Sequence, residues 1–325
     1  MSTIKDVASK AGVSIATVSR VLNNRGAISE ATRKAVFQAI EELDYHPNEV
    51  ARSLGKQRSK IIGLILPPLT HQFYAELATS IEDAAYRHGY KLMLCNSFFD
   101  SEKEKSYVEM LRRNMVDGII VGSHTGETDY FTSSRLPIVS VETIISDDIP
   151  AVLSDNFQGG SLATRHLLAK GCKNLVHISG ELRLNLSPDE RADAFTTLCE
   201  QAGVRHHIFE ATEQMLRDLN YSEIVARIFH EIPDVDGIFA SSDMIAAECV
   251  KTCAALGYHI PEDIKIVGFD GISISKMIHP PLTTIGQDIP ALGLECVRQL
   301  LTCIAGEEVE HRTILPVKLI ERKTT

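Results

Sequence analysis

The sequence predicts an α/β protein in which a small all-α module precedes a much larger body built on parallel sheets. Two observations carry this prediction. The first 24 residues hold two short helical patterns that are separated by Gly12. From Lys60 onward, short apolar runs alternate with helical stretches, which is the pattern of buried parallel strands covered by helices on both faces.

The composition is that of an ordinary globular protein. The chain has 325 residues, of which 44% are hydrophobic and 23% are charged. No apolar run approaches the roughly 20 residues of a membrane span, and the first ten residues lack the apolar core of a signal peptide. Seven scattered cysteines, with no Cys-x-x-Cys, fit reduced thiols and give no metal-ligand spacing. We therefore expect a cytoplasmic protein without a membrane partner, a metal or a cofactor.

The charge is distributed unevenly along the chain. The net charge of −10 argues against nucleic-acid binding if it is taken as a whole. Residues 1–60, however, hold 10 Lys and Arg against 6 Asp and Glu, a formal +4, and the remainder carries −14. A small basic module on a large acidic body suits a protein that touches phosphates with one end only.

The N-terminal stretch predicts a helix-turn-helix. Thr3 can cap a first helix together with Asp6, and Ser14 can cap a second helix after the turn at Gly12. The second helix turns an apolar stripe inward and has a size that fits the DNA major groove. Its outer face carries Ile15, Ala16, Thr17, Ser19, Arg20 and Asn23. A solvated helical hairpin is the alternative, because helix-Gly-helix patterns are common.

A third helix is expected over residues 29–44, with Val36, Phe37, Ile40 and Leu43 packed on the first two helices. A further short helical stretch follows at 49–54. About seven residues cannot hold a helix alone in water, so this stretch should order only when it is paired with a copy of itself and pressed against DNA. A flexible linker is the alternative.

Several motifs in order carry a family resemblance. The runs DVASKAGVSIATVSRVLN, ISEATRKAV, IEELDYHPN and ARSL resemble the DNA-binding headpiece of the lactose- and galactose-repressor family. The resemblance implies a headpiece at 1–46, a hinge helix and linker at 47–59, and a two-lobed, periplasmic-binding-protein-like α/β domain at 60–325 that binds a sugar and dimerises. It also implies that the hinge helix enters the minor groove, where Asn48, Ala51 and Leu54 would contact DNA and Leu54 would wedge between base steps.

The reading of DNA is expected to centre on Arg20, since an arginine can take guanine O6 and N7 together. Ile15 and Ala16 stand at the family's main discriminating positions, and as apolar residues they favour contact with thymine methyl groups or simple shape fit over hydrogen bonding. The side chains that can hydrogen-bond phosphates and set the register are Thr3, Ser14, Thr17, Ser19 and Asn23.

The body is expected to alternate strands and helices. The expected strands are 61–66, 91–96, 118–121, 137–141, 151–154, 175–179, 237–241 and 264–269, and the expected helices are 73–88, 102–113, 157–170, 190–202, 221–230 and 243–256. Two late segments, 282–285 and 315–320, are expected to cross back and tie the lobes together.

Ligands of open α/β sheets bind beyond the carboxyl ends of the strands, and several residues stand at such ends. Glu142, Asn156, Ser242 and Gln287 follow strands or begin helices, and Ser123 is a further candidate. By resemblance, Arg191 and Asp270 match the family's ligand-clamping arginine and aspartate, and Phe73 and Tyr74 match an aromatic pair that lines the pocket. Glu142 stands where relatives often carry Asp, and Ala194 replaces a usual glycine.

Alternatives remain for these residues. Asp270 and Arg191 could form an inter-lobe salt bridge that only staples the lobes, and Phe73 could pack in the core. Carboxylates and a guanidinium suit the hydroxyls of a sugar. A sugar phosphate would want more cations than can be placed here. The motifs SDNFQGG and CNS look most like sucrose- or fructoside-type repressors.

Catalytic motifs are absent: the sequence has no G-x-G-x-x-G, G-x-S-x-G, Walker loop or H-E-x-x-H. We therefore predict a non-enzyme, a homodimeric transcriptional repressor of a carbohydrate-utilisation operon. It would bind a pseudo-palindromic double-stranded operator and respond to a sugar or sugar phosphate. A dimer is favoured over a tetramer because no Leu-heptad helix trails the C-terminal run LPVKLIERKTT. A sugar-binding receptor without DNA function and a sugar-acting enzyme are the alternatives.

Overall fold

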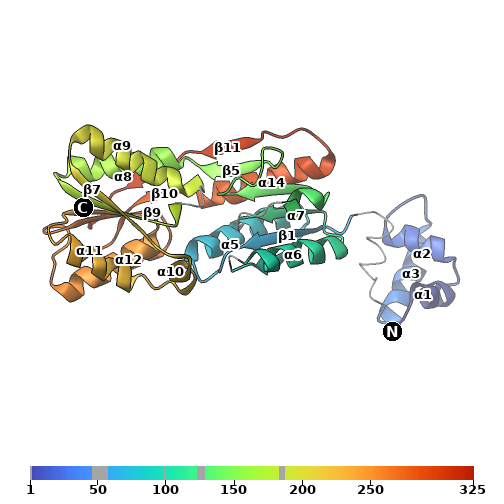
Figure 1. Ribbon diagram of the computed structural model, residues 1–325. Helices are drawn as coiled ribbons and strands as arrows, with labels where there is room; N and C mark the ends of the chain where they lie inside the picture. The colour runs from blue at the N-terminus through green and yellow to red at the C-terminus, as the bar shows by residue number, and fades with distance from the viewer. Residues whose placement is uncertain (1, 46–57, 99, 123–128, 183–186) are drawn as a thin grey trace. The chain divides into compact units, whose positions relative to one another are not determined.

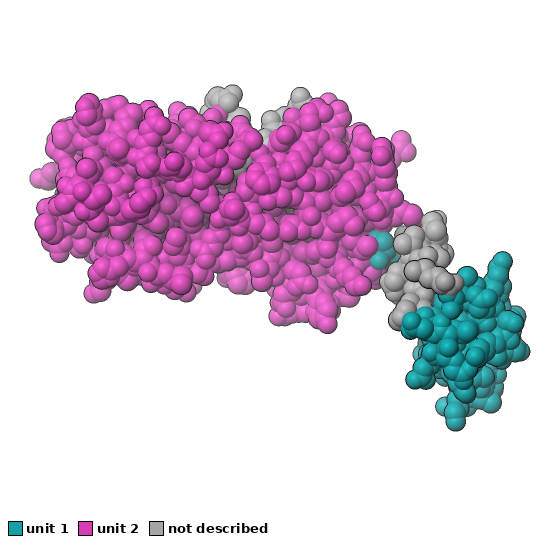
Figure 2. Space-filling model, turned by 90° about the horizontal axis from the view of Figure 1, so that it is seen from below, with its two compact units in different colours: residues 1–59 teal, residues 60–325 magenta. Residues whose placement is uncertain are grey.

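A computed structural model describes residues 2–45, 58–98, 100–122, 129–182 and 187–325 (Figure 1). The chain divides into two compact units, residues 1–59 and residues 60–325, which Figure 2 colours separately. Most of the expected hinge at 47–59 lies outside the described residues, so the division into headpiece, hinge and body stays a prediction.

The first unit contains the three expected helices, α1 (Ile4–Ala11), α2 (Ile15–Leu22) and α3 (Glu30–Glu42). Their starts follow from local capping. The Thr3 hydroxyl accepts from the Asp6 N–H and the Asp6 carboxylate accepts from the Thr3 N–H, which makes the reciprocal capping box. Gly12 ends α1 with φ of 66°, a left-handed conformation that glycine adopts without steric cost.

The helices of the first unit enclose a small core. Its buried members come from all three helices and from the chain just after α3: Val7, Ala8, Val18, Val21, Val36, Ala39 and Tyr45. The expectation that Phe37 belongs to this core is wrong, because its side chain is 50% exposed. Val36 already occupies the inward direction, and the next residue of a helix points about 100° away from it.

The second unit is built on two six-stranded sheets (Figure 1). We call lobe 1 the sheet of order β11-β5-β4-β3-β1-β2 with its covering helices, and lobe 2 the sheet of order β12-β10-β9-β8-β6-β7 with its own. All strand pairs are parallel except β10 with β12, which is antiparallel. Lobe 1 holds β1 (Ile61–Leu66), β2 (Lys91–Asn96), β3 (Gly118–Val121), β4 (Ile138–Val141), β5 (Ala151–Ser154) and β11 (Arg312–Leu315); lobe 2 holds β6 (Asn174–Ser179), β7 (Arg205–Glu210), β8 (Gly237–Ala240), β9 (Lys265–Asp270), β10 (Thr283–Gly286) and β12 (Lys318–Ile320).

Helices cover the sheets as the alternating pattern predicts. The helices are α5 (Gln72–Arg87), α6 (Ser101–Arg113), α7 (Asp129–Ser133), α8 (Asn156–Ala169), the 3-10 turn η2 (Ser187–Asp189), α9 (Glu190–Ala202), α10 (Glu213–Asp218), α11 (Ser222–Glu231), α12 (Asp243–Leu256), α13 (Ile274–Met277) and α14 (Ile289–Ala305). Helix α14 packs on α5 in lobe 1, and α8 packs on α9 in lobe 2. In the described parts of the chain, no helix is both long and apolar enough to span a bilayer.

The chain passes between the two lobes at three places. It leaves lobe 1 after β5, returns after β10, and crosses again between β11 and β12. The prediction that two late segments tie the lobes together is therefore confirmed. The second of these segments is split at Pro316, which has no N–H to donate to a sheet and separates β11 of one lobe from β12 of the other.

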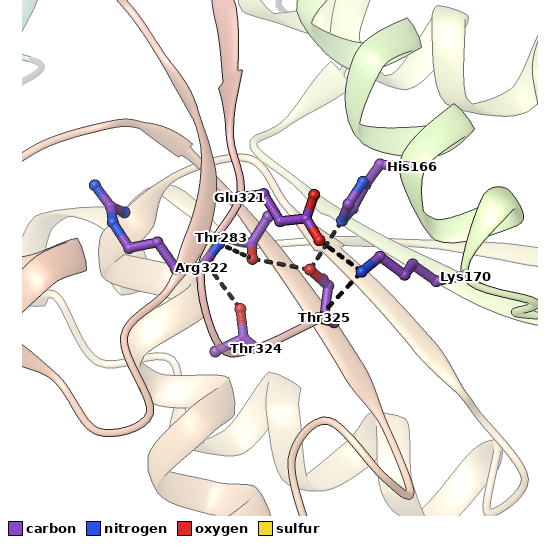
Figure 3. Close-up of polar contacts among 7 residues, drawn as sticks. All are labelled: His166, Lys170, Thr283, Glu321, Arg322, Thr324 and Thr325. Atoms are coloured by element: carbon purple, nitrogen blue, oxygen red, sulfur yellow. Dashed lines mark hydrogen bonds and ion pairs between the residues drawn. The ribbon is translucent and has the colours of Figure 1, made fainter.

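The C-terminal residues fasten the last crossing to lobe 2 (Figure 3). The Thr324 hydroxyl donates to the Ile266 carbonyl over 2.6 Å, and the Thr325 hydroxyl lies 2.8 Å from His166 Nε2. Lys170 Nζ donates to Glu321 over 2.6 Å. Thr324, four residues after the end of β12, is fully buried, so this segment packs into lobe 2.

Candidate functional site

The outer face of α2 is available to a partner in the way the sequence predicts. Ile15, Ala16 and Arg20 are exposed, and 43% of Ile15 is accessible. A single exposed apolar side chain is common on protein surfaces, so the case for a contact surface rests on Ile15 together with the exposed Ala16 and Arg20 of the same helix. This helix therefore presents one cation and two apolar side chains outward.

The other α2 residues are engaged within the helix. Ser14 Oγ accepts from the Thr17 N–H over 3.1 Å, and the two hydroxyls lie 2.9 Å apart. The Asn23 side-chain amide donates to the Ser19 carbonyl over 2.8 Å. These contacts shape the two ends of α2, and each of these groups keeps further hydrogen-bonding capacity. The three hinge candidates, Asn48, Ala51 and Leu54, lie outside the described residues.

A second cluster of the expected residues forms in the larger unit, at the carboxyl ends of strands and at the crossings between lobes. Glu142 follows β4, Asp270 ends β9, and Gln287 follows β10. Asn156 opens α8 just after the first crossing, and Arg191 stands in the first turn of α9. Residues far apart in the chain thus meet, because parallel strands end at one edge of their sheet.

Arg191 lies at the centre of this cluster and is only 5% exposed. Its Nε donates to Asn156 Oδ1 over 2.8 Å, and its Nη1 donates to the Ser241 carbonyl over 2.7 Å. Its guanidinium carbon lies 3.4 Å from the centre of the Phe269 ring, a stacked cation–π arrangement. The third nitrogen, Nη2, is 3.8 Å from Glu142 Oε2, which is a loose ion pair rather than a hydrogen bond.

Both acidic residues of the cluster use one oxygen and leave the other without a hydrogen bond. Glu142 Oε1 accepts from the Ser154 N–H over 2.6 Å, and Asp270 Oδ1 accepts from the Gln287 amide over 2.8 Å. Within the described structure, Glu142 Oε2 and Asp270 Oδ2 are buried and make no hydrogen bond. Since buried polar atoms are nearly always paired, these two oxygens indicate a site built for hydrogen-bond donors from outside the chain.

The backbone at the two acids is strained as well. Glu142 has φ of 55° and Asp270 has φ of 109°, in a region that side-chain-bearing residues rarely adopt. Such a conformation costs on the order of 1–3 kcal/mol and persists only where the surroundings hold it. Gly271 follows with φ of 75°, and a Cβ there would meet the Gly286 Cα at 2.8 Å. The turn after β9 is therefore fixed tightly beside β10.

Three further side chains complete the cluster. Tyr74 is among the residues that the sequence predicts, whereas His71 and Tyr221 are not. His71 Nδ1 and the Tyr221 hydroxyl are buried without a hydrogen-bond partner among the described residues. Burial, and then the charge of Arg191, lowers the pKa of His71 to about 4, so this imidazole is neutral near pH 7. Burial raises the pKa of Tyr74 and of Tyr221, and the charge of Asp270 adds to both shifts.

The cluster can bind a donor-rich neutral molecule better than an anion. Burial raises the pKa of both Glu142 and Asp270, and Arg191 opposes the shift in each case. One guanidinium therefore faces two carboxyl groups, which leaves it little capacity to neutralise a bound phosphate. In the described part of the chain no group of three His, Cys, Asp or Glu side chains has a metal-binding arrangement.

Asp243 supports the turn that carries Asp270. It is fully buried, and its carboxylate accepts from the Ile272 N–H over 2.9 Å and from the Thr284 hydroxyl over 2.5 Å. Burial raises its pKa to about 7. One signal for this role is visible in the sequence, since Asp243 comes soon after a buried strand and beside the expected Ser242. His71 likewise stands two residues before the expected aromatic pair.

The remaining expected residues have other surroundings. Phe73 is 5% exposed and packs in the lobe 1 core with Leu66 and Leu77, which is the alternative considered for it. Ser242 is buried and caps α12, because its hydroxyl accepts from the Ile245 N–H over 3.2 Å. Ser123 lies outside the described residues. The site that the structure assembles therefore rests on the acids, Arg191, Asn156, Gln287 and Tyr74.

The chain resembles known proteins along its whole length. Residues 3–48 match the family described as "Bacterial regulatory proteins, lacI family", and residues 164–325 match the periplasmic binding protein-like domain. The ribose operon repressor of Halalkalibacterium halodurans is 39% identical, with 100% of this chain and 97% of that protein covered. The sucrose operon repressor of Streptococcus mutans is 38% identical, with 98% and 97% covered. The lac repressor dimer bound to operator is 26% identical, with a TM-score of 0.86 over 99% of this chain and 98% of that one.

Proposed function

The chain belongs to the LacI family of bacterial regulatory proteins, and from that premise we propose that it is a homodimeric repressor of a carbohydrate-utilisation operon, controlled by a sugar held between its lobes. The family consists of transcriptional repressors and not of enzymes. The observation that carries the sugar site is the buried Arg191 beside the Glu142 and Asp270 oxygens that make no hydrogen bond among the described residues.

The donor and acceptor pattern supports a polyhydroxylated ligand. Carboxylate oxygens accept from hydroxyl groups, and a guanidinium donates to ring and hydroxyl oxygens in a fixed fork. Tyr74 and Tyr221 add hydroxyl groups that can both donate and accept. A phosphorylated sugar would bring its negative charge close to two carboxyl groups, so we propose a neutral sugar.

Relatives whose names refer to different sugars have nearly equal sequence identity to this chain. Ribose operon repressors are 39% and 36% identical, and sucrose operon repressors are 36–38% identical. The sucrose- or fructoside-type ligand suggested by SDNFQGG and CNS therefore stays a prediction, and ribose is an equally supported candidate. A thermal-shift panel of D-ribose, D-fructose, sucrose and their phosphates separates these possibilities, since a ligand that binds only the folded chain raises its stability.

On the DNA side we propose that two headpieces read a pseudo-palindromic operator. Arg20 would contact guanine while Ile15 and Ala16 meet thymine methyl groups. Thr3, Ser14, Thr17, Ser19 and Asn23 are retained as phosphate contacts. Between the headpieces, the hinge would supply Asn48, Ala51 and the wedge Leu54. Because a transcription regulator acts on DNA, we place the protein in the bacterial cytoplasm.

A symmetric operator requires a symmetric protein. The strand β2 lies at the edge of its sheet, and Leu94 on it is 46% exposed while Phe98 just after it is 39% exposed. Apolar side chains on an open edge favour association with another copy. We propose that lobe 1 takes part in the dimer through this edge.

The decisive experiment uses the full chain and a library of symmetric duplexes. Selection should enrich a pseudo-palindrome, and fluorescence anisotropy on that duplex should show an affinity that changes when the sugar from the thermal-shift panel is added. Failure of the dimeric chain to select any duplex contradicts the repressor. Duplex binding that ignores every sugar contradicts the proposed control.

A further inference from the structure

Two short segments of the larger unit carry both site residues and direct contacts between the lobes. The first is the start of α5 in lobe 1, which holds His71 and Tyr74. The second is the turn after β9 in lobe 2, which begins at Asp270. Each segment therefore faces the candidate sugar site with some residues and faces the other lobe with the residues next to them.

Polar contacts between these segments run from lobe 2 donors to lobe 1 acceptors. Glu76 Oε1 accepts from the Ser273 N–H over 3.0 Å and from the Ser273 hydroxyl over 2.8 Å. Gln72 Oε1 accepts from the Ile274 N–H over 3.2 Å. These are N–H groups at the start of α13, where a helix offers no acceptor of its own. Side chains of lobe 1 thus supply the hydrogen-bond acceptors that the first N–H groups of α13 lack within their own helix.

Apolar packing and a buried acid fix the same turn on both sides. Ile272 is fully buried and, with Ile274, belongs to the lobe 1 core that contains Phe73 and Leu77. The Ile272 N–H donates to Asp243, which belongs to lobe 2. The turn is therefore anchored in lobe 2 while its side chains pack into lobe 1, so a change in the angle between the lobes must disturb it.

We propose that Glu76 and Gln72 form a latch on Ser273 and Ile274 that holds the two lobes in the arrangement that assembles the sugar site. This inference rests on the proposed function, because it assigns regulation to the same site. Neither latch side chain belongs to the cluster around Arg191. Glu76 and Gln72 act as positioning residues, which set how often Tyr74 of lobe 1 stands opposite Asp270 of lobe 2.

Population arithmetic gives the direction of the effect. A ligand that needs residues from both lobes binds only the assembled arrangement, and its apparent Kd equals the intrinsic Kd divided by the fraction assembled. Loss of the latch lowers that fraction and weakens sugar binding without removing a sugar contact. Glu76 is partly exposed, so the effect is modest.

Amide hydrogen exchange tests the latch without any ligand. In the full chain, Glu76→Ala should speed exchange at the Ser273 amide, which loses its acceptor. It should also speed exchange at the Ile274 amide, because the bond to Gln72 breaks more often once the lobes separate more readily. Glu76→Gln keeps the side-chain oxygen and should restore slow exchange. Glu82→Ala, an exposed change on the same helix, is the matched control and should leave both amides as they are. Unchanged exchange in Glu76→Ala overturns the proposal.

Titration then tests the consequence for the sugar. With D-ribose and sucrose as probes, Glu76→Ala should raise the apparent Kd roughly three- to tenfold, while Glu76→Gln and Glu82→Ala stay near the wild-type value. Faster exchange with an unaltered Kd also overturns the latch as a regulator. If the wild-type chain binds neither probe, that result counts against these sugars in the proposed function, and amide exchange alone decides the latch.

Discussion

The two sets of proposed binding residues have opposite surroundings. On α2 the residues offered to DNA are exposed or serve local caps, and Ile15 is 43% accessible. In the larger unit, Arg191, Glu142 and Asp270 are at most 8% exposed, and both acids have left-handed backbone angles. A DNA duplex presents its own charged surface and needs only a complementary face. A small sugar must be enclosed, so its site is assembled and desolvated in advance.

This difference predicts that substitutions at the enclosed site lower the free energy of unfolding far more than substitutions on the exposed face of α2. A buried charge that loses its partner keeps its desolvation penalty, whereas an exposed side chain returns to water. Four substitutions, two around the enclosed site and two in the headpiece, test this comparison.

Arg191→Ala should be the most disruptive of the four. It leaves Glu142 and Asp270 buried without a cation, and we expect a loss of about 3–5 kcal/mol in the free energy of unfolding, together with loss of sugar binding. Urea denaturation and sugar titration measure the two effects. The control is Arg205→Ala, whose pair with Asp234 is exposed on both sides and should cost less than about 1 kcal/mol. If both arginine substitutions lowered the free energy of unfolding equally, burial of Arg191 would have no special effect on stability and the comparison would fail.

Asp243→Asn should alter how stability depends on pH. Burial raises the pKa of Asp243 from 3.8 to about 7, so between these values the folded chain holds a proton here that the unfolded chain releases. Stability from this group is therefore greatest below about pH 4 and is lost as the pH rises toward 7. Over that range the free energy of unfolding should fall by on the order of 1.4 kcal/mol for each step of one in pH.

The asparagine that replaces Asp243 does not titrate, so the part of this fall that comes from Asp243 should disappear. A smaller fall should remain, because burial also raises the pKa of Asp270 and Glu142. The free energy of unfolding, measured at intervals between pH 4 and 8, gives the slope for each protein. The new side-chain amide also places a donor beside the Ile272 N–H, so the substitution should lower overall stability at every pH. Parallel curves for the wild type and Asp243→Asn would show that the carboxyl is ionised throughout.

Arg20→Ala should change selectivity and leave the larger unit untouched. Loss of a bidentate guanine contact should reduce discrimination between the selected operator and a duplex with that base pair replaced, by roughly 1–3 kcal/mol. Competition binding measures it, and sugar affinity of the same protein is the internal control. A uniform loss on both duplexes would assign Arg20 to phosphate contact.

Thr3→Ala should have a small effect, confined to the headpiece. It removes the hydroxyl that accepts from the Asp6 N–H, and a lost N-cap costs about 1 kcal/mol. Thr3→Ser keeps the hydroxyl and is the matched control. Thermal unfolding of the headpiece signal, followed by residue-specific NMR in the full chain, measures the shift. A loss of more than about 2 kcal/mol would mean that Thr3 does more than cap α1.

The apolar and helical patterns predict most elements of the body and fail at particular ones. They miss helix α14, although Asp288 caps it and Pro290 stands in its first turn, which are ordinary start signals. They also miss the strands β7 and β11, because both lie at sheet edges, where exposed residues replace the apolar runs that mark buried strands. In the headpiece, all three helices are predicted, but Phe37 is wrongly expected in the core, where its exposed side chain does not lie.

The order of most elements and the start of each headpiece helix can be derived from the chain alone, because caps, turns and apolar periods act between residues a few positions apart. The family is indicated by the resemblance of several motifs in order. Most members of the enclosed site are predicted from strand ends and from the family resemblance, but the full set required the folded structure. His71, Tyr221 and Asp243 join Arg191 and Asp270 there because three crossings bring distant strand ends together. The burial that strips these groups of water, and leaves two carboxylate oxygens without a hydrogen bond among the described residues, arises from that packing and has no counterpart in any local run of residues.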